Sequence, residues 1–99
     1  MHPYLRPITE AFWAARDDTH ARGMTSYMKD QYPFLGIMAA PRRALQRPFM
    51  TRATLPPPRE IVPIAKELWE MEHREFQYFG VGLVVRTVMV VGGNVISEM

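Results

Sequence analysis

The chain has 99 residues, of which 47% are hydrophobic and 22% charged, which is ordinary for one small globular domain. It contains no cysteine, which excludes disulfide bonds, thiolate catalysis and thiolate metal sites. No secretory signal opens the chain, and the most apolar run, residues 81–91, is interrupted by Arg86 and is shorter than the ~20 residues that span a bilayer. These features predict a cytoplasmic protein without a membrane partner.

The formal net charge of +2 is unevenly distributed along the chain. Residues 1–58 hold eight Lys or Arg against four Asp or Glu, whereas residues 59–99 hold four against six. The interval 31–58 contains no acidic side chain and four arginines, Arg42, Arg43, Arg47 and Arg52. Because summed charge steers polyanions, this part of the chain predicts an anionic partner.

Apolar residues at helical spacing predict a first helix that buries Leu5, Ile8 and Phe12 and ends near residues 17 and 18. Asp18 or Thr19 is then expected to cap the second helix, because a side-chain oxygen there can accept an otherwise unpaired backbone N–H.

The second helix is expected to stop at Pro33, since the residue before a proline is pushed out of the helical region. Residues 34–37 are too apolar for an exposed loop and predict a turn that fills the space between helices, with a positive φ at Gly36. The face of the second helix carries Met24, Tyr27 and Met28.

A third helix is predicted with Pro41 at its first position, where the missing N–H costs nothing. Leu45 and Phe49 form its apolar stripe, and Pro48 should kink or end it. Residues 55–58, Leu-Pro-Pro-Pro, predict a stiff extended connector.

Two more helical stripes follow the connector, with a solvated acidic rim between them. The rim is expected to comprise Glu67, Glu70, Glu72 and Glu75. The stripes comprise Ile61, Ile64, Ala65 and Leu68, then Phe76, Phe79 and Leu83. Residues 84–91 are rich in β-branched side chains, so helix and strand both stay open there, and Gly92-Gly93-Asn94 is expected to end the element.

Helix pairs with short connectors predict an all-α fold of stacked antiparallel pairs, in a single domain over residues 1–99. The last helix is apolar on several faces. We therefore expect either a missing C-terminal half or a second copy of the chain to cover it.

Four segments in register resemble the DNA alkylation repair proteins of the AlkD type. They are Met1–Tyr4, Tyr27–Ile37 with Pro41–Arg43, Glu67–Trp69 and Arg74–Gln77. The resemblance implies a HEAT-like helical repeat whose basic concave face holds duplex DNA. It also implies excision of N3- and N7-alkylated purines by cleavage of the glycosidic bond.

Residues that match positions of the family near DNA are carried over from the resemblance. Tyr27 matches a tyrosine near the lesion, with core packing as the alternative reading, and Met38 stands where relatives can have a polar side chain. The basic residues are candidates for phosphate contacts, with a solvated helix start as the alternative. The candidate DNA-binding residues are Tyr27, Lys29, Met38, Arg42, Arg43 and Arg47.

The catalytic Trp-Trp-Asp motif of the relatives has no counterpart here. The only tryptophans are Trp13 and Trp69, and the last aspartate is Asp30. The chain therefore resembles the N-terminal portion of a glycosylase, no catalytic residue is assigned, and its status as an enzyme stays open. The three histidines have no metal-ligand spacing, so neither a metal nor another cofactor is expected.

Other classes of protein stay open as alternatives. A separate polypeptide could complete the enzyme, the chain could be a truncated inactive copy, or its apolar last helix could make it a protein-interaction module.

Overall fold

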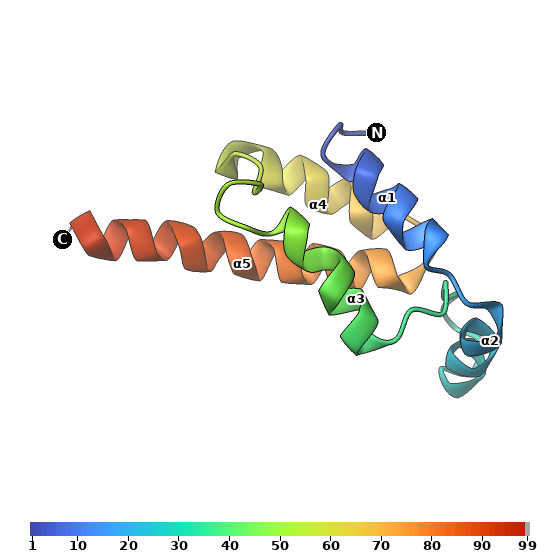
Figure 1. Cartoon of the computed structure of the whole chain (residues 1–99). Coiled ribbons are helices and arrows are strands. Elements are labelled where there is room, and N and C mark those ends of the chain that lie inside the picture. The colour runs from blue at the N-terminus through green and yellow to red at the C-terminus, as the bar shows by residue number, and fades with distance from the viewer. Residues whose placement is uncertain (99) are drawn as a thin grey trace.

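The computed structural model describes residues 1–98, and the side chains of residues 1–92. Residues 1–98 form five α-helices and two short 3₁₀ turns and contain no strand, which confirms the all-α class (Figure 1). The elements are α1 (Leu5–Ala14), α2 (Asp18–Tyr27), α3 (Ala39–Gln46), η1 (Arg47–Phe49), η2 (Pro58–Glu60), α4 (Ile61–Glu70) and α5 (Arg74–Glu98).

The α4–α5 hairpin is the centre of the arrangement. The two helices lie side by side, α1 and α3 pack onto them, and α5 projects well beyond the other helices at its C-terminal end (Figure 1). At the core, the ring of Phe12 stacks on Phe76 at a centroid distance of 5.3 Å and meets Phe79 edge-on at 6.0 Å. These aromatic contacts join α1 to α5.

The predicted apolar stripes of the first, fourth and fifth helices are confirmed. Their inward positions are buried together with two residues of the loop between α2 and α3. The core contains Leu5, Ile8, Phe12, Leu35, Ile37, Ile61, Ile64, Leu68, Phe76, Phe79 and Leu83.

The start of α2 differs from the prediction by one residue. Asp17 is the N-cap, and its Oδ1 accepts the backbone N–H of His20 at 2.9 Å. Asp18 and Thr19 instead belong to the first turn of the helix. The backbone N–H of Asp17 donates to the carbonyl of Leu35 at 2.8 Å, so the cap is fixed by the loop as well.

The end of α2 also lies elsewhere than predicted. The helix stops at Tyr27, well before Pro33, because Lys29 and Asp30 take left-handed φ angles of 56° and 58°. The N–H of Asp30 closes on the carbonyl of Thr25 at 2.9 Å, an i+5→i bond typical of helix C-termini. A local C-terminal turn, and not the proline, therefore ends the helix.

The apolar turn at residues 34–37 is buried as predicted, and Gly36 has a φ of 94°. A Cβ built at Gly36 would lie 1.9 Å from the carbonyl oxygen of Asp17. The position therefore requires glycine both for its conformation and for the close approach of α2.

The acidic rim predicted around the α4–α5 junction is wrong at Glu75. Glu70 and Glu72 are exposed, but the side chain of Glu75 is fully buried. Its carboxylate accepts the backbone N–H groups of Leu35, Gly36 and Ile37 at 2.9, 2.9 and 3.1 Å. A buried turn leaves backbone donors that need acceptors, and α5 supplies one for all three.

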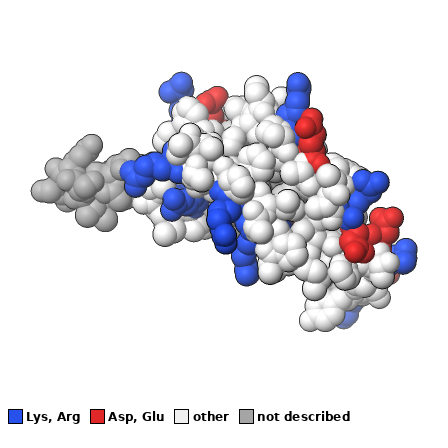
Figure 2. Space-filling view, viewed as in Figure 1, with Lys and Arg blue, Asp and Glu red and all other residues white. Residues whose placement is uncertain are grey.

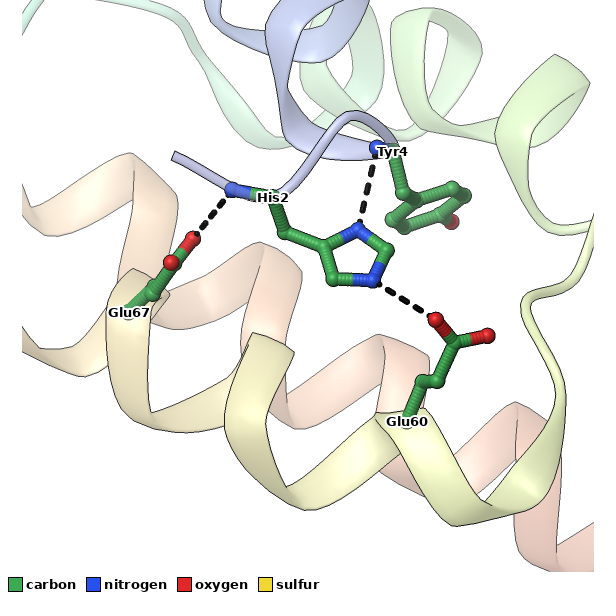
Figure 3. Close-up of polar contacts among 4 residues, drawn as sticks. All are labelled: His2, Tyr4, Glu60 and Glu67. Carbon is green, nitrogen blue, oxygen red and sulfur yellow. Dashed lines mark hydrogen bonds and ion pairs between the residues drawn. The ribbon is translucent and has the colours of Figure 1, made fainter.

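Glu67, also expected in that rim, is half-buried and holds the N-terminus (Figure 3). It accepts the backbone N–H of His2 at 2.9 Å. The Nδ1 of His2 accepts the N–H of Tyr4 at 3.1 Å, so the neutral ring carries its proton on Nε2, which lies 3.0 Å from Glu60. The Tyr4 hydroxyl donates to the carbonyl of Phe49 at 2.6 Å, and burial raises the pKa of this tyrosine.

The third helix begins at Ala39, so Pro41 is its third residue and not its first. Position three still belongs to the first turn, where no N–H is needed. The predicted effect of Pro48 is confirmed, because α3 ends at Gln46 and tightens into the 3₁₀ turn that contains this proline.

Residues 84–91 are helical, and the predicted stop at Gly92-Gly93-Asn94 is wrong, since α5 runs to Glu98. The Thr87 hydroxyl donates to the carbonyl of Leu83 at 2.8 Å, a bond within the helix. Intrinsic preferences of under ~1 kcal/mol per residue do not outweigh packing against α4 and the connector.

By length and composition alone, Arg74–Gly92 would suffice to cross a membrane. This corrects the prediction that the apolar run is too short. Within the fold, however, the segment packs on α4, and its charged residues Glu75 and Arg86 bond to backbone groups of the loops. These contacts hold one face of the segment in the fold, while Val81, Val84, Val85 and Val88 on another face are exposed.

Candidate nucleic-acid interface

A groove between α3 and α5 gathers arginines from two segments that are distant in sequence. Its volume is about 420 Å³. Arg43 comes from α3, Arg47 from η1, Arg52 from the following loop and Arg86 from α5. The lining is completed by Gln46, Met50 and Thr51, so it contains four cations and no carboxylate. We call this surface the arginine groove.

The floor of the arginine groove is set by a close approach of the loop to α5. A Cβ at Gly82 would lie 3.3 Å from the terminal methyl of Met50, so a larger residue would displace that side chain. One turn further along α5, the Nε of Arg86 donates to the carbonyl of Met50 at 3.1 Å. This bond ties the loop that bears Arg52 to the helix.

The described part of the groove is rich in positive charge. Figure 2 shows a band of Lys and Arg side chains across this face, with Asp and Glu lying toward other parts of the surface. The two segments that build the groove, residues 39–58 and 76–92, contain no acidic residue. Such a cationic surface attracts polyanions.

A second depression of about 350 Å³ lies on the other side of the start of α3. Tyr27 stands at its edge and is 86% exposed, which rules out the alternative that this tyrosine packs in the core. Most of the lining is apolar, and Arg42 and Tyr78 provide its polar groups. We call this depression the tyrosine pocket.

Arg42 connects the two sites. Its guanidinium lies 5.1 Å from the centroid of the Tyr78 ring and donates to Oε1 of Gln46 at 2.6 Å. Burial, and then the neighbouring charge of Arg43, lower its pKa, but a guanidinium stays protonated at neutral pH. A half-buried cation held in one orientation is suited to bind an anion at the rim of the pocket.

A second guanidinium extends this stack. Arg74 lies 4.2 Å from the ring centroid of Tyr32 and 5.5 Å from that of Tyr78, and it donates to Oε1 of Gln77 at 2.8 Å. Two guanidinium groups therefore contact the ring of Tyr78, which forms part of the wall of the tyrosine pocket.

The structure places four of the six predicted site residues in the two sites and two outside them. Tyr27 and Arg42 line the tyrosine pocket, and Arg43 and Arg47 line the arginine groove. Met38 is the exposed N-cap residue of α3. Lys29 is exposed in the turn after α2 and lines neither site.

Arg52, Arg86 and Tyr78 are site residues that the sequence reasoning did not select. Arg52 lies in the acid-free interval but outside the predicted helix. The sequence signal for Arg86 as a site residue is its charge within an apolar run, which by itself indicates only an interruption of a hydrophobic segment. Its spacing of three from Leu83, a core residue, places it at the border of the buried face of α5.

Within the part of the chain that the structure describes, neither site has a carboxylate in its lining. The nearest buried acid, Glu75, has both oxygens engaged by the loop. Among the described residues no group of His, Asp or Glu is arranged to hold a metal ion.

Fold and surface together define a small all-helical protein with one strongly cationic face. The family model of the DNA alkylation repair enzymes matches residues 8–89, most of the chain, so the chain belongs to that family. No curated protein matches the sequence. Membership of the family supports a role in DNA repair with DNA as the partner.

Proposed function

We propose that this chain binds duplex DNA through backbone phosphates in the arginine groove, as part of alkylation repair of the AlkD type. The observation that carries the proposal is the convergence of Arg43, Arg47 and Arg86 on one groove whose segments contain no acid. Arginine side chains bind phosphate through several parallel N–H donors, and such contacts position a protein without reading sequence.

The tyrosine pocket gives the proposed complex a second contact. Tyr27 is exposed beside Arg42, so a duplex that crosses the start of α3 can meet an aromatic ring and a fixed cation together. We propose that this end of the interface faces the alkylated purine, in a HEAT-like helical scaffold that acts in the cytoplasm.

Cleavage of the glycosidic bond is the finer activity of this proposal, and it needs a carboxylate near the sugar. The side chains that the structure describes around the arginine groove and the tyrosine pocket include none. We therefore propose that residues 1–98 supply the DNA-binding surface and that a carboxylate from elsewhere completes the glycosylase.

Fluorescence anisotropy of a labelled duplex at several salt concentrations tests the proposal. We expect sequence-independent binding whose log–log salt slope is near −0.9 for each phosphate neutralised, so that Arg43, Arg47 and Arg86 together give a slope of roughly −3. Arg43→Ala with Arg47→Ala should weaken binding and reduce the slope by about 2. A salt-independent affinity, or no binding at low salt, would contradict the proposal.

Arg59→Ala is the matched control, because Arg59 is exposed on η2 and lines neither site. It removes one positive charge, the same as either single variant at Arg43 or Arg47, and should leave the salt slope close to that of the wild type. A separate assay for release of N7-methylguanine from alkylated duplex tests the catalytic part. Release by the purified chain alone would show that the carboxylate is not missing.

A further inference from the structure

The long helix α5 carries two apolar stripes, and the described chain buries only one of them. The buried stripe contains Phe76, Phe79 and Leu83. The other consists of Val81, Val84, Val85 and Val88, all exposed, at the spacing i, i+3, i+4 and i+7 of one helix face. A soluble surface helix needs only one apolar stripe, so the second requires a partner.

The neighbouring helix α4 extends this exposed stripe into a two-helix face. Val62 and Trp69 on α4 are 61% and 58% exposed, at i and i+7. Two adjoining depressions, of about 620 and 240 Å³, run between α4 and α5 and share Ala65, Trp69 and Val84. Contiguous apolar patches larger than roughly a few hundred Å² are uncommon on monomeric proteins and mark interaction surfaces.

Two opposite charges lie on this face beside the apolar residues. Lys66 and Glu70 both line the larger depression and are exposed. Within the described residues neither of them makes an ion pair. Lysine four residues ahead of glutamate is the weaker order for a pair within one helix, so both charges are available to a partner.

A surface with an apolar centre and one charge of each sign on the same helix is self-complementary under a twofold axis. If two copies of α4 cross in antiparallel orientation, Lys66 of each copy meets Glu70 of the other, and Trp69 lies near the depression of the partner. Closed dimers of this isologous kind are the commonest soluble assemblies.

We propose that the exposed face of α4 and α5, centred on Trp69 and Val84, binds a second copy of this chain, with Lys66 pairing to Glu70 of the other copy. The arginine groove remains free in such a dimer, because Gly82 and Arg86 lie on a different side of α5 from Val81, Val84 and Val88. The inference does not depend on DNA binding.

Analytical ultracentrifugation over a range of protein concentrations tests the proposal, with the single variants Lys66→Glu and Glu70→Lys and the double variant that exchanges the two charges. We expect the wild type to dimerise reversibly. Each single variant makes two symmetry-related pairs repulsive and should weaken the dimer about tenfold, and the exchanged double variant should restore it. The two Lys66–Glu70 ion pairs would determine the orientation of the copies more than the affinity, since exposed ion pairs contribute little to binding free energy by themselves.

Val85→Asp places a charge in the apolar face and should abolish the dimer, whereas Tyr27→Ala removes a large exposed side chain from outside it and should not. All these positions are exposed, so folding is not at risk, and circular dichroism confirms it. A wild-type monomer at every concentration would overturn the proposal. So would a dimer that survives Val85→Asp, or a double variant as weak as the single ones.

Discussion

The carboxylate of Glu75 accepts the backbone N–H of Gly36 at 2.9 Å, across a sequence separation of 39 residues. This bond joins the first turn of α5 to the loop that leads into α3. The loop in turn sets the start of α3, which bears Arg42 and Arg43 and continues into the 3₁₀ turn that bears Arg47. The position of the proposed DNA-binding surface therefore depends on a buried carboxylate that lines neither the arginine groove nor the tyrosine pocket.

We predict that Glu75→Gln destabilises the fold by about 3–5 kcal/mol. An amide has one acceptor oxygen in place of two, so part of the buried cluster of backbone N–H groups is left unpaired, and the NH₂ group of glutamine faces a backbone N–H. Chemical denaturation followed by circular dichroism measures the change. Glu72→Gln is the control, since Glu72 is exposed in the connection between α4 and α5, and it should stay within about 0.5 kcal/mol. Equal effects of the two variants would contradict the assigned role of Glu75.

Gly36→Ala should destabilise the protein by at least ~2 kcal/mol, because alanine is strained at a φ of 94° and its Cβ would overlap the carbonyl oxygen of Asp17. Gly23→Ala provides the opposite result. Gly23 lies in α2 with nothing within 4 Å of its would-be Cβ, so alanine should stabilise by about 0.5–1 kcal/mol. Thermal unfolding measures both variants. We expect the unfolding midpoint to fall for Gly36→Ala and to rise for Gly23→Ala.

The cap of α2 predicts a pH dependence of stability. The backbone N–H of His20 lowers the pKa of Asp17 below its ordinary value. The charge of His20, the N–H of Thr19 and the charge of Arg22 act in the same direction, and desolvation opposes them. The ionised carboxylate therefore favours the folded state above about pH 4, and this contribution is lost as the pH falls through the lowered pKa.

Asp17→Asn keeps a good capping oxygen but cannot titrate, so it should change stability little at pH 7 and reduce the loss of stability below about pH 4. Unfolding midpoints of both proteins between neutral and acid pH measure the difference. Parallel curves for wild type and variant would show that the cap carboxylate does not contribute to the acid response.

The buried stripes could be predicted from sequence because periodicity reports directly which side of a helix faces the core. Leu5, Ile8 and Phe12 are examples, and so is the buried turn around Gly36, whose apolar residues have no other place. The ends of α2 and α5 could not be predicted in this way. The helix α2 ends after Tyr27 in a backbone turn in which two non-glycine residues, Lys29 and Asp30, take left-handed φ angles. Their residue types alone do not predict this turn.

Glu75 and Arg86 were misread for a shared reason. Each is a charged residue whose partner is a backbone group far away in sequence, and a one-dimensional pattern records side chains and not the carbonyl and N–H groups they meet. The contribution of α3 to the candidate site could be predicted, because its arginines are adjacent in sequence. The contribution of α5 depends on the tertiary packing that brings Arg86 to Met50.

Tyr27→Ala separates binding from stability. The side chain is 86% exposed, so its removal should change the free energy of unfolding by no more than about 0.5 kcal/mol. If Tyr27 contacts DNA beside Arg42, the same change should weaken duplex binding while leaving the salt slope unaltered, since no charge is lost. Anisotropy titrations at two salt concentrations distinguish this from an indirect effect, and an unchanged affinity would remove Tyr27 from the interface.

Arg86 tests whether α5 belongs to the DNA-binding surface. Its guanidinium both lines the arginine groove and bonds the carbonyl of Met50, so Arg86→Ala would change charge and loop position together. Arg86→Gln keeps a donor near Met50 but removes the charge, and it should lower the salt slope by about 0.9 and leave the unfolding midpoint nearly unchanged. Arg86→Lys keeps the charge and should retain the slope. If both variants bind DNA like the wild type, phosphates do not contact α5, and only the α3 side of the groove would bind DNA.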